Sequence, residues 1–289
     1  MVVYRGGTPG EKVKAPAKIN VGLHILGVRP DGYHEIWTIL QQINLADELL
    51  LLDTPDFSLS LTCNRPDIPV NEDNLCLKAA RLLQRETGCR KGVKIHLHKN
   101  IPVGAGLGGG SSDAAATLTA LNQMWGTGLS KATLRTLAEK LGSDVPFFLE
   151  GECCIASGRG EVLKKIDPVI KSPMVLVCPN VQISTSWAYK NIKNYRLTSK
   201  KENIIFQSYF KKDISDPQIR NILSNDFETP VFEHYPTLKE IKETLLECGA
   251  YYASLSGSGS SVYAAFYSSE EARTASQRIH VEGSVHYLE

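Results

Sequence analysis

The sequence predicts an α+β protein built from two domains. Three observations carry this prediction: a length of 289 residues, an alternation of strand-like and helix-like segments, and a change of composition near residues 167–173. A chain of this length suits one large domain or two of ordinary size, and it can bury a substantial core. We expect an N-terminal α/β domain at 1–166 and a C-terminal domain of helices on an antiparallel sheet at 167–289.

Strand patterns dominate the first hundred residues. Residues 13–26 mix β-branched and small side chains around Pro16, which predicts two strands separated by a bend. Asn74 precedes a helical pattern that ends at Gly88, as expected for a capped helix. Further strands are predicted, mostly from apolar runs and alternation, at 36–44, 48–52, 57–62 and 93–98.

The remainder of the chain alternates helix and strand patterns. A polar connection rich in Lys and Asn is expected at about 190–212, and a glycine/serine loop at 253–261. The predicted helices are 113–125, 130–141, 217–223, 237–248 and 269–279, and the predicted strands are 153–157, 174–178 and 262–267.

Composition and charge exclude several classes of protein. With 32 basic and 31 acidic residues the net charge is +1, so we expect neither nucleic acid nor a membrane as partner. The seven cysteines are scattered without a Cys-x-x-Cys pair, which indicates reduced thiols, a cytoplasmic location and no zinc site. The short Gly/Lys tail at 5–14 leaves a plastid address open, although it is short for one.

One stretch, residues 102–116, carries most of the chemical information. Five glycines fall within 104–110 and are followed by Ser111, Ser112, Asp113 and three alanines. Clustered glycines permit positive φ and close backbone approach, whereas Ser and Asp suit the N-cap of the helix that the alanines continue. The free amides of such a helix start bind phosphate oxygens. An ordinary glycine-rich turn is the alternative.

Two familiar nucleotide-binding motifs fit this stretch poorly. It is not a Walker A loop, because no Gly-Lys-Ser/Thr sequence closes it. A literal G-x-G-x-x-G occurs at 104–109, but the preceding segment alternates and carries Lys99 and Pro102, and the first acid beyond the following helix is Glu139. A nicotinamide-dependent enzyme is therefore a distant interpretation.

The motif Pro102-x-Gly-x-Gly-Leu-Gly-Gly-Gly-Ser-Ser-Asp-Ala-Ala resembles the phosphate loop of the GHMP kinase superfamily. More narrowly, five further motifs resemble the branch of that superfamily whose acceptor carries a cytidine diphosphate. In chain order they are 15–20, 29–35, 72–75, 142–146 and 255–259.

This resemblance implies a GHMP kinase fold with one left-handed crossover in the N-terminal domain, against the usual right-handed rule. It implies that 1–166 is an ATP-binding domain and 167–289 a substrate-side domain, with the active site in the cleft between them. ATP and Mg²⁺ are the expected cofactors, and we expect a monomer or weak homodimer.

The resemblance also implies two catalytic residues. Asp144 corresponds to the family's catalytic aspartate and Lys18 to its active-site lysine. A helix-capping or Pro-turn aspartate and a solvated surface lysine are the structural alternatives. If the two side chains pair, Lys18 would keep Asp144 ionised. Whether Asp144 takes the proton or orients the acceptor hydroxyl stays open.

The nucleotide is expected on the glycine loop and its flanks. Ser111 and Ser112 would bind phosphate directly or through Mg²⁺, and Asn74 and Lys99 match positions near the adenosine. An N-capping Asn and a strand-end Lys need no ligand to explain them. The expected nucleotide-binding set is Asn74, Lys99, Pro102, Gly104, Gly106, Leu107, Gly108, Gly109, Gly110, Ser111 and Ser112.

The cytidine end is expected on three other segments. Tyr33 and His34 correspond to the pair that recognises the base, and Tyr189 to the aromatic residue that stacks on it, with Trp187 as the alternative. The polyol or diphosphate is expected near Asn20 and Thr185, and the loop with Gly257 and Gly259 is expected to accept the diphosphate through its amides, a mere turn being the alternative. Another small-alcohol GHMP kinase and a non-catalytic nucleotide-binding module are the competing functions; the latter would lack Lys18 or Asp144.

Overall fold

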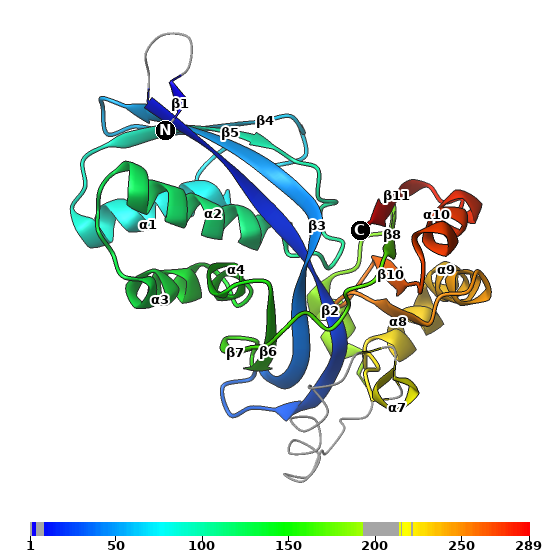
Figure 1. The fold of residues 1–289 in the computed structure, drawn as a ribbon. Helices are drawn as coiled ribbons and strands as arrows, with labels where there is room; N and C mark the ends of the chain where they lie inside the picture. The colour runs from blue at the N-terminus through cyan, green and yellow to red at the C-terminus, as the bar shows by residue number, and fades with distance from the viewer. Residues whose placement is uncertain (1, 4–8, 193–213, 215, 221) are drawn as a thin grey trace. The chain divides into compact units, whose positions relative to one another are not determined.

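The computed structural model describes residues 2–3, 9–192, 214, 216–220 and 222–289, which form an α+β fold (Figure 1). The chain forms two compact units that interleave along the sequence. The first unit comprises residues up to Ala17, Leu45–Ile101 and Gly108–Gly151. The second comprises Lys18–Asn44, Pro102–Leu107 and Glu152–Glu289. The single boundary expected after residue 166 stays a prediction.

The first unit is built on a sheet of strand order β1-β2-β3-β5-β4. β3 pairs with β5 antiparallel, whereas β4 and β5 are parallel and are connected through α1. This connection corresponds to the expected crossover. That the crossover is left-handed stays a prediction. β2 and β3 are long and also contribute to the second unit. The strands are β1 (Val2–Val3), β2 (Pro9–Val28), β3 (His34–Thr54), β4 (Leu59–Cys63) and β5 (Gly92–His98).

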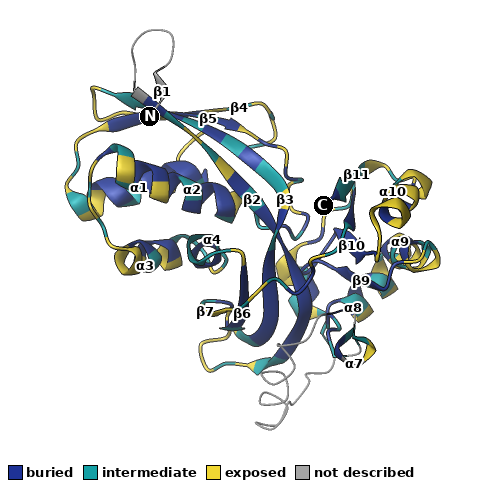
Figure 2. Cartoon of the chain, viewed as in Figure 1, coloured by how far each residue is buried: buried dark blue, intermediate teal, exposed yellow. Residues whose placement is uncertain are grey.

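Helices cover this sheet and share its core. Leu49 and Leu51 of β3 and Ile95 of β5 are buried against α1 and α2, whose buried faces appear dark blue in Figure 2. α1 has the predicted bounds, because the Asn74 side chain caps its start and Gly88, at φ 68°, ends it. The helices are α1 (Leu75–Thr87), α2 (Gly109–Met124), α3 (Lys131–Leu141) and α4 (Val145–Glu150).

The second unit carries helices on an antiparallel sheet, as predicted. Here β6 (Cys153–Gly158) extends β3 and β7 (Val162–Lys165) extends β6. A separate sheet has the order β11-β8-β10-β9, and α9 and α10 pack on it with exposed outer faces (Figure 2). Its strands are β8 (Met174–Pro179), β9 (Tyr252–Leu255), β10 (Val262–Ala265) and β11 (Gly283–Leu288). The unit's helices are α5 (Thr185–Lys190), α7 (Pro217–Arg220), α8 (Glu228–His234), α9 (Pro236–Glu247) and α10 (Ser269–Arg278).

The first long strand differs from its prediction. β2 runs without a bend through Pro16, so the expected pair of strands is wrong. The φ of proline is compatible with extended backbone, and alternate residues from Ala15 to Ile25 are buried in the core. β3 likewise continues through residues 45–47, where a break was expected.

The start of α2 also differs. The helix begins at Gly109 rather than near residue 113, and Gly108, at φ 70°, occupies the N-cap position without a side-chain cap. The capping role predicted for Ser111, Ser112 and Asp113 is therefore wrong. The structure adds short elements that the patterns did not predict: α4, α5, α8, β7, β9 and β11.

The polar connection predicted at 190–212 lies almost entirely outside the described residues. Among the helices that the structure describes, none has the length and apolar character needed to cross a membrane. All seven cysteines are free thiols, as the scattered pattern predicts.

Candidate active site

The glycine loop has the backbone geometry that its composition predicts. Gly104, Gly106 and Gly108 all have positive φ, at 69°, 79° and 70°. A Cβ at Gly106 would lie 2.1 Å from the carbonyl oxygen of Ser256, so no larger residue fits there. Gly104 has open space around it, and glycine is required there by φ alone.

The N-terminus of α2 offers unpaired donors. Its first i→i−4 bond runs from Ser112 N to Gly108 O at 2.9 Å, so the amides of Gly109, Gly110 and Ser111 have no partner within the helix. The buried Ser112 Oγ has no hydrogen-bond partner in the described part of the chain. These groups and the positive end of the helix dipole can bind an oxyanion.

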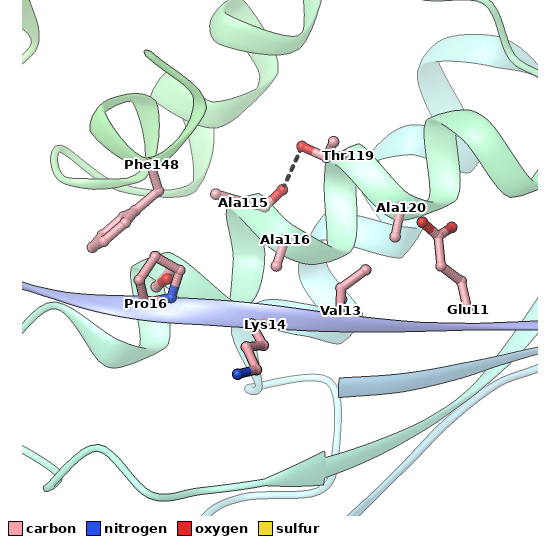
Figure 3. A pocket seen from close by; sticks show the side chains of 10 residues that line it. Glu11, Val13, Lys14, Pro16, Ala115, Ala116, Thr119, Ala120 and Phe148 are labelled. Atoms are coloured by element: carbon pink, nitrogen blue, oxygen red, sulfur yellow. Dashed lines mark hydrogen bonds between the residues drawn. The ribbon is translucent and has the colours of Figure 1, made fainter. Parts of the chain in front are cut away.

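A hollow of about 220 Å³ lies between α2 and β2 in the first unit (Figure 3). Ala115 and Ala116 of α2 and Phe148 of α4 face β2 across it, and Ser112 also contributes to its lining. Because alanine side chains are short, this face of α2 leaves room for the hollow.

Lys99 belongs to a buried ion cluster in the first unit. Its Nζ donates to Asp113 Oδ2 at 2.8 Å and also to Asp47 Oδ2. Asp47 Oδ1 accepts the amides of Asn100 at 2.6 Å and Ile101 at 2.8 Å. Burial lowers the pKa of Lys99, but the two carboxylates outweigh it and raise that pKa, so the ammonium stays charged.

The third member of this cluster, Asp113, has fewer hydrogen bonds to its carboxylate than Asp47. Its Oδ1 is buried without a hydrogen-bond partner among the described residues, and burial raises its pKa to about 7 despite the opposing charge of Lys99. The cluster ties the end of β5 to α2. Asp47 was not among the residues that the sequence predicted for the site.

Two other predicted residues of the first unit lie at helix starts. Asn74 Oδ1 accepts from Cys76 N at 2.9 Å and its Nδ2 donates to Pro69 O at 2.8 Å, so the side chain caps α1. Asp144 is half-buried immediately before α4, and its side chain does not cap that helix. The capping alternative considered for Asp144 is therefore wrong.

In the second unit the structure brings Lys18 and Asn20 together beside the glycine loop. Lys18 Nζ donates to Asn20 Oδ1 at 2.6 Å and to Gly106 O at 2.9 Å. Asn20 Nδ2 donates in turn to Thr38 Oγ1 at 3.1 Å. Lys18 is only 5% exposed, which excludes the interpretation as a solvated surface lysine.

The glycine/serine loop lies against the same residues. Gly257 has φ 58°, and a Cβ there would lie 3.2 Å from Asn20 Oδ1 and 3.7 Å from Lys18 Nζ. Ser256 Oγ donates to Gly106 O at 3.0 Å. Nearby, Thr185 Oγ1 and Ser258 Oγ lie 3.2 Å apart. Polar atoms of Lys18, Asn20 and this loop therefore form one cluster.

An aromatic group in the second unit contains the residues predicted to bind a base. The rings of His34 and Tyr189 stack with centroids 4.4 Å apart, and desolvation lowers the pKa of His34. Tyr33 is exposed, and the Arg159 guanidinium lies 4.7 Å from its ring centroid. Trp187 instead packs with its centroid 4.8 Å from that of His234.

The predicted pairing of the two catalytic residues stays a prediction. Lys18 belongs to the second unit and Asp144 to the first. The glycine loop is divided in the same way, since Pro102–Leu107 belong to the second unit and Gly108 onward to the first. The geometry within each unit therefore supplies two sets of groups: oxyanion donors on α2, and the Lys18 cluster with its aromatic neighbours.

Comparison with known proteins identifies the family. A model described as "GHMP kinases N terminal domain" matches residues 74–152, and one described as "GHMP kinases C terminal" matches residues 212–282. The chain belongs to the GHMP kinases, as its motifs predicted.

Relatives narrow the comparison within that family. A protein of Prosthecochloris aestuarii named 4-diphosphocytidyl-2-C-methyl-D-erythritol kinase is 41% identical over 92% of this chain and 93% of its own length. A protein of the same name from Geobacter metallireducens is 43% identical, with the same coverage.

Solved structures agree with this family assignment. The chain resembles the crystal structure of a 4-(cytidine 5'-diphospho)-2C-methyl-D-erythritol kinase with a TM-score of 0.80 and 32% identity, covering 96% of this chain and 98% of that one. A homoserine kinase from Cytophaga hutchinsonii shares the fold, with a TM-score of 0.75 and 20% identity over 100% of this chain and 97% of that one.

Proposed function

We propose that this chain is an ATP-dependent phosphotransferase that phosphorylates the 2-hydroxyl of 4-diphosphocytidyl-2-C-methyl-D-erythritol, a step of non-mevalonate isoprenoid synthesis. The observation that carries the proposal is the 41–43% identity to kinases named for that substrate over nearly their whole length. The Lys18 cluster, the α2 donors and the His34–Tyr189 pair support it, because each supplies a group that this reaction needs.

Phosphoryl transfer depends mainly on positioning the two partners and neutralising the charge on the moving group. In our proposal Asp144 faces the acceptor hydroxyl and accepts its proton or orients it. Lys18 supplies positive charge between the acceptor oxygen and the γ-phosphate. The Lys18 contacts to Asn20 and Gly106 support this role, since these two neutral oxygen acceptors hold the ammonium in a fixed position.

The α2 start and its loop are the proposed site for the ATP phosphates. The amides of Gly109 to Ser111 and the free Ser112 hydroxyl fit phosphate oxygens or a phosphate-bound Mg²⁺. In the described ranges no three His, Cys, Asp or Glu side chains gather as a metal site. Mg²⁺ prefers oxygen ligands, and the serine hydroxyls at the start of α2 are donors of that kind. Bound there, Mg²⁺ would neutralise phosphate charge.

Asn74 and Lys99 are the residues proposed to contact the adenosine, and both side chains already bind other parts of the protein. The Asn74 side-chain amide and the Lys99 ammonium already have protein partners. A nucleotide at this place would therefore meet groups already fixed in position. Pro102, Gly104 and Leu107 would line the loop through their backbone.

The acceptor is proposed to lie in the second unit. Tyr189 is the proposed stacking residue for cytosine, because it lies beside His34, the other residue predicted to contact the base. Its ring also packs edge-on against Phe227, whereas Trp187 packs on His234 and Tyr235. Tyr33 and His34 would read the base edges. The polyol and diphosphate would contact the remaining predicted residues: Asn20, Thr185, Gly257 and Gly259.

A coupled assay of ADP release tests the proposal. The purified chain is supplied with MgATP and, in separate reactions, the cytidyl substrate, mevalonate or homoserine. We expect turnover of the cytidyl substrate only. Turnover of mevalonate or homoserine alone would favour another small-alcohol kinase, and ATP binding without transfer to any acceptor would favour a non-catalytic module. We also propose a cytoplasmic location, supported by the free cysteines. A monomer or weak homodimer is proposed as its assembly state.

A further inference from the structure

Asn225 lies in the segment that leads into α8 and was not among the predicted site residues. It is buried, and its backbone forms a parallel bridge with Leu23 of β2. Leu23 N donates to Ser224 O at 2.9 Å and Asp226 N donates to Leu23 O at 2.8 Å. The backbone around Asn225 is therefore fixed to the same strand that carries Lys18 and Asn20.

The Asn225 side chain uses all of its principal hydrogen-bonding groups. Its Nδ2 donates to the carbonyl oxygens of Leu255 and Gly257, both at 2.8 Å, and its Oδ1 accepts from Phe227 N at 3.0 Å. An uncharged side chain with two N–H donors and an acceptor must be an amide, and Asn has the shorter reach of the two. The start of the glycine/serine loop is thus held by one buried amide.

Gly257 lies directly beside two residues proposed for the active site, Lys18 and Asn20. The space that a Gly257 side chain would fill lies within 3.2 Å of Asn20 Oδ1 and 3.7 Å of Lys18 Nζ. Gly257 also has positive φ, so its backbone conformation depends on fixed contacts rather than on side-chain packing. Asn225 supplies one of these contacts directly, through the Gly257 carbonyl.

We propose that Asn225 is a positioning residue that holds Gly257 against Lys18 and Asn20 and thereby fixes where the loop meets the acceptor's diphosphate. The inference rests on the proposed function, because that function places the diphosphate at this loop. Asn225 touches neither substrate nor nucleotide in this account and acts only through the backbone of Gly257. An error of about 1 Å in such positioning costs up to about a hundredfold in rate.

The test compares Asn225 with a second buried amide of the same unit. Gln41 Nε2 donates to Ile170 O at 2.7 Å, and its Oε1 accepts from Val169 N at 2.9 Å and Ile170 N at 3.0 Å. Asn225→Ala and Asn225→Asp are therefore paired with Gln41→Ala and Gln41→Glu. Each pair removes the same two kinds of hydrogen bond from a buried, backbone-bound amide.

All variants are assayed 20 degrees below the lowest unfolding midpoint of the set, so that folded proteins are compared. We expect both pairs to lower the midpoint, but only the Asn225 variants to lower kcat/KM for the cytidyl acceptor, by about ten- to a hundredfold. We expect the KM for ATP to change by less than about threefold. The affinity for CDP, measured by calorimetry, should fall in Asn225→Ala and not in Gln41→Ala.

Three outcomes would overturn the proposal. Folded Asn225 variants with acceptor kinetics and CDP binding equal to those of the Gln41 variants would show that the amide is merely structural. An equal rise in the KM values for ATP and acceptor would assign Asn225 to general stability. A wild-type chain that does not turn over the cytidyl substrate would contradict the proposed function itself, and the inference would fall with it.

Discussion

His34 and Tyr189 stack with their ring centroids 4.4 Å apart and their planes 20° from parallel. The pair joins a residue of the 29–35 turn to a residue of α5, two segments far apart in the sequence. A stacked pair of this kind forms a flat surface against which a third planar ring can lie. It gives the proposed cytosine site a physical basis in the second unit.

Replacing the stacking ring should weaken acceptor binding selectively. We expect Tyr189→Leu to raise the KM for the cytidyl substrate about three- to tenfold, because an aromatic contact contributes about 0.5–1.5 kcal/mol beyond the area it buries. Tyr189→Phe should remain near wild type, and the KM for ATP should not change. Trp187→Leu is the matched control, and a larger effect at Trp187 than at Tyr189 would assign the stacking role to Trp187.

The buried ion cluster should contribute strongly to stability. Lys99→Met would leave the carboxylates of Asp47 and Asp113 without their cation, and we expect the free energy of unfolding to fall by about 3–5 kcal/mol. Lys140→Met removes a surface pair with Glu86 in the same unit and should cost about 0–1 kcal/mol. Urea unfolding measures both, and equal losses would contradict this view of the cluster.

Asp113 should make stability depend on pH. Burial raises its pKa from 3.8 in the unfolded chain to about 7, so the folded chain binds this proton more tightly. Its contribution to stability should therefore fall as the pH rises from about 4 to 7, by at most about 1.4 kcal/mol per pH unit. Asp113→Asn should remove this slope. If the free energy of unfolding changed equally with pH in wild type and Asp113→Asn, the predicted role of Asp113 would be contradicted.

Two glycines of the loop should respond differently to the same substitution. Gly106→Ala forces a Cβ to within 2.1 Å of Ser256 O, so we expect kcat/KM to fall at least a hundredfold, since the loop must move. At Gly104 an added Cβ would have open space, so Gly104→Ala should cost only the strain of a positive φ, roughly 1 kcal/mol of stability. Steady-state kinetics of the two variants tests this, and equal losses would show that φ rather than space is decisive.

Asp144→Asn should separate chemistry from binding. We expect kcat to fall about 10²- to 10⁴-fold, the range typical of removing a general base, while CDP binding stays nearly unchanged. Ser143→Ala, at the exposed neighbouring position, is the control and should keep wild-type kinetics. A kcat for Asp144→Asn within threefold of wild type would remove Asp144 from its proposed role.

Local patterns predicted the elements that have strong end signals. α1 matches its prediction because Asn74 and Gly88 mark its ends. α3 begins one residue after its predicted start, because Ser130 caps the helix. The continuity of β2 through Pro16 could not be predicted from local pattern, because it depends on burial of alternate side chains by tertiary neighbours. Short elements such as α4 and β7 carry too few residues for a periodic signal.

In the site, too, residues within local motifs could be predicted, whereas residues defined by contacts distant in sequence could not. Motifs marked Lys18, Asn20 and the glycine loop, and the structure brings these together. Asp47 and Asn225 were missed because their roles arise from contacts with residues far away in sequence: Lys99 for Asp47, and Leu255 and Gly257 for Asn225. A lone acid or amide carries no such information in one sequence.

Transfer of labelled phosphate tests the central claim most directly. The chain is incubated with ATP labelled at the γ-phosphate, Mg²⁺ and 4-diphosphocytidyl-2-C-methyl-D-erythritol, and the products are identified by phosphorus NMR and mass spectrometry. We expect the label in a new phosphomonoester on the 2-hydroxyl of the intact cytidyl compound, formed in equal amount to ADP. Label found only in inorganic phosphate, or in a phosphorylated mevalonate or homoserine control, would contradict the account.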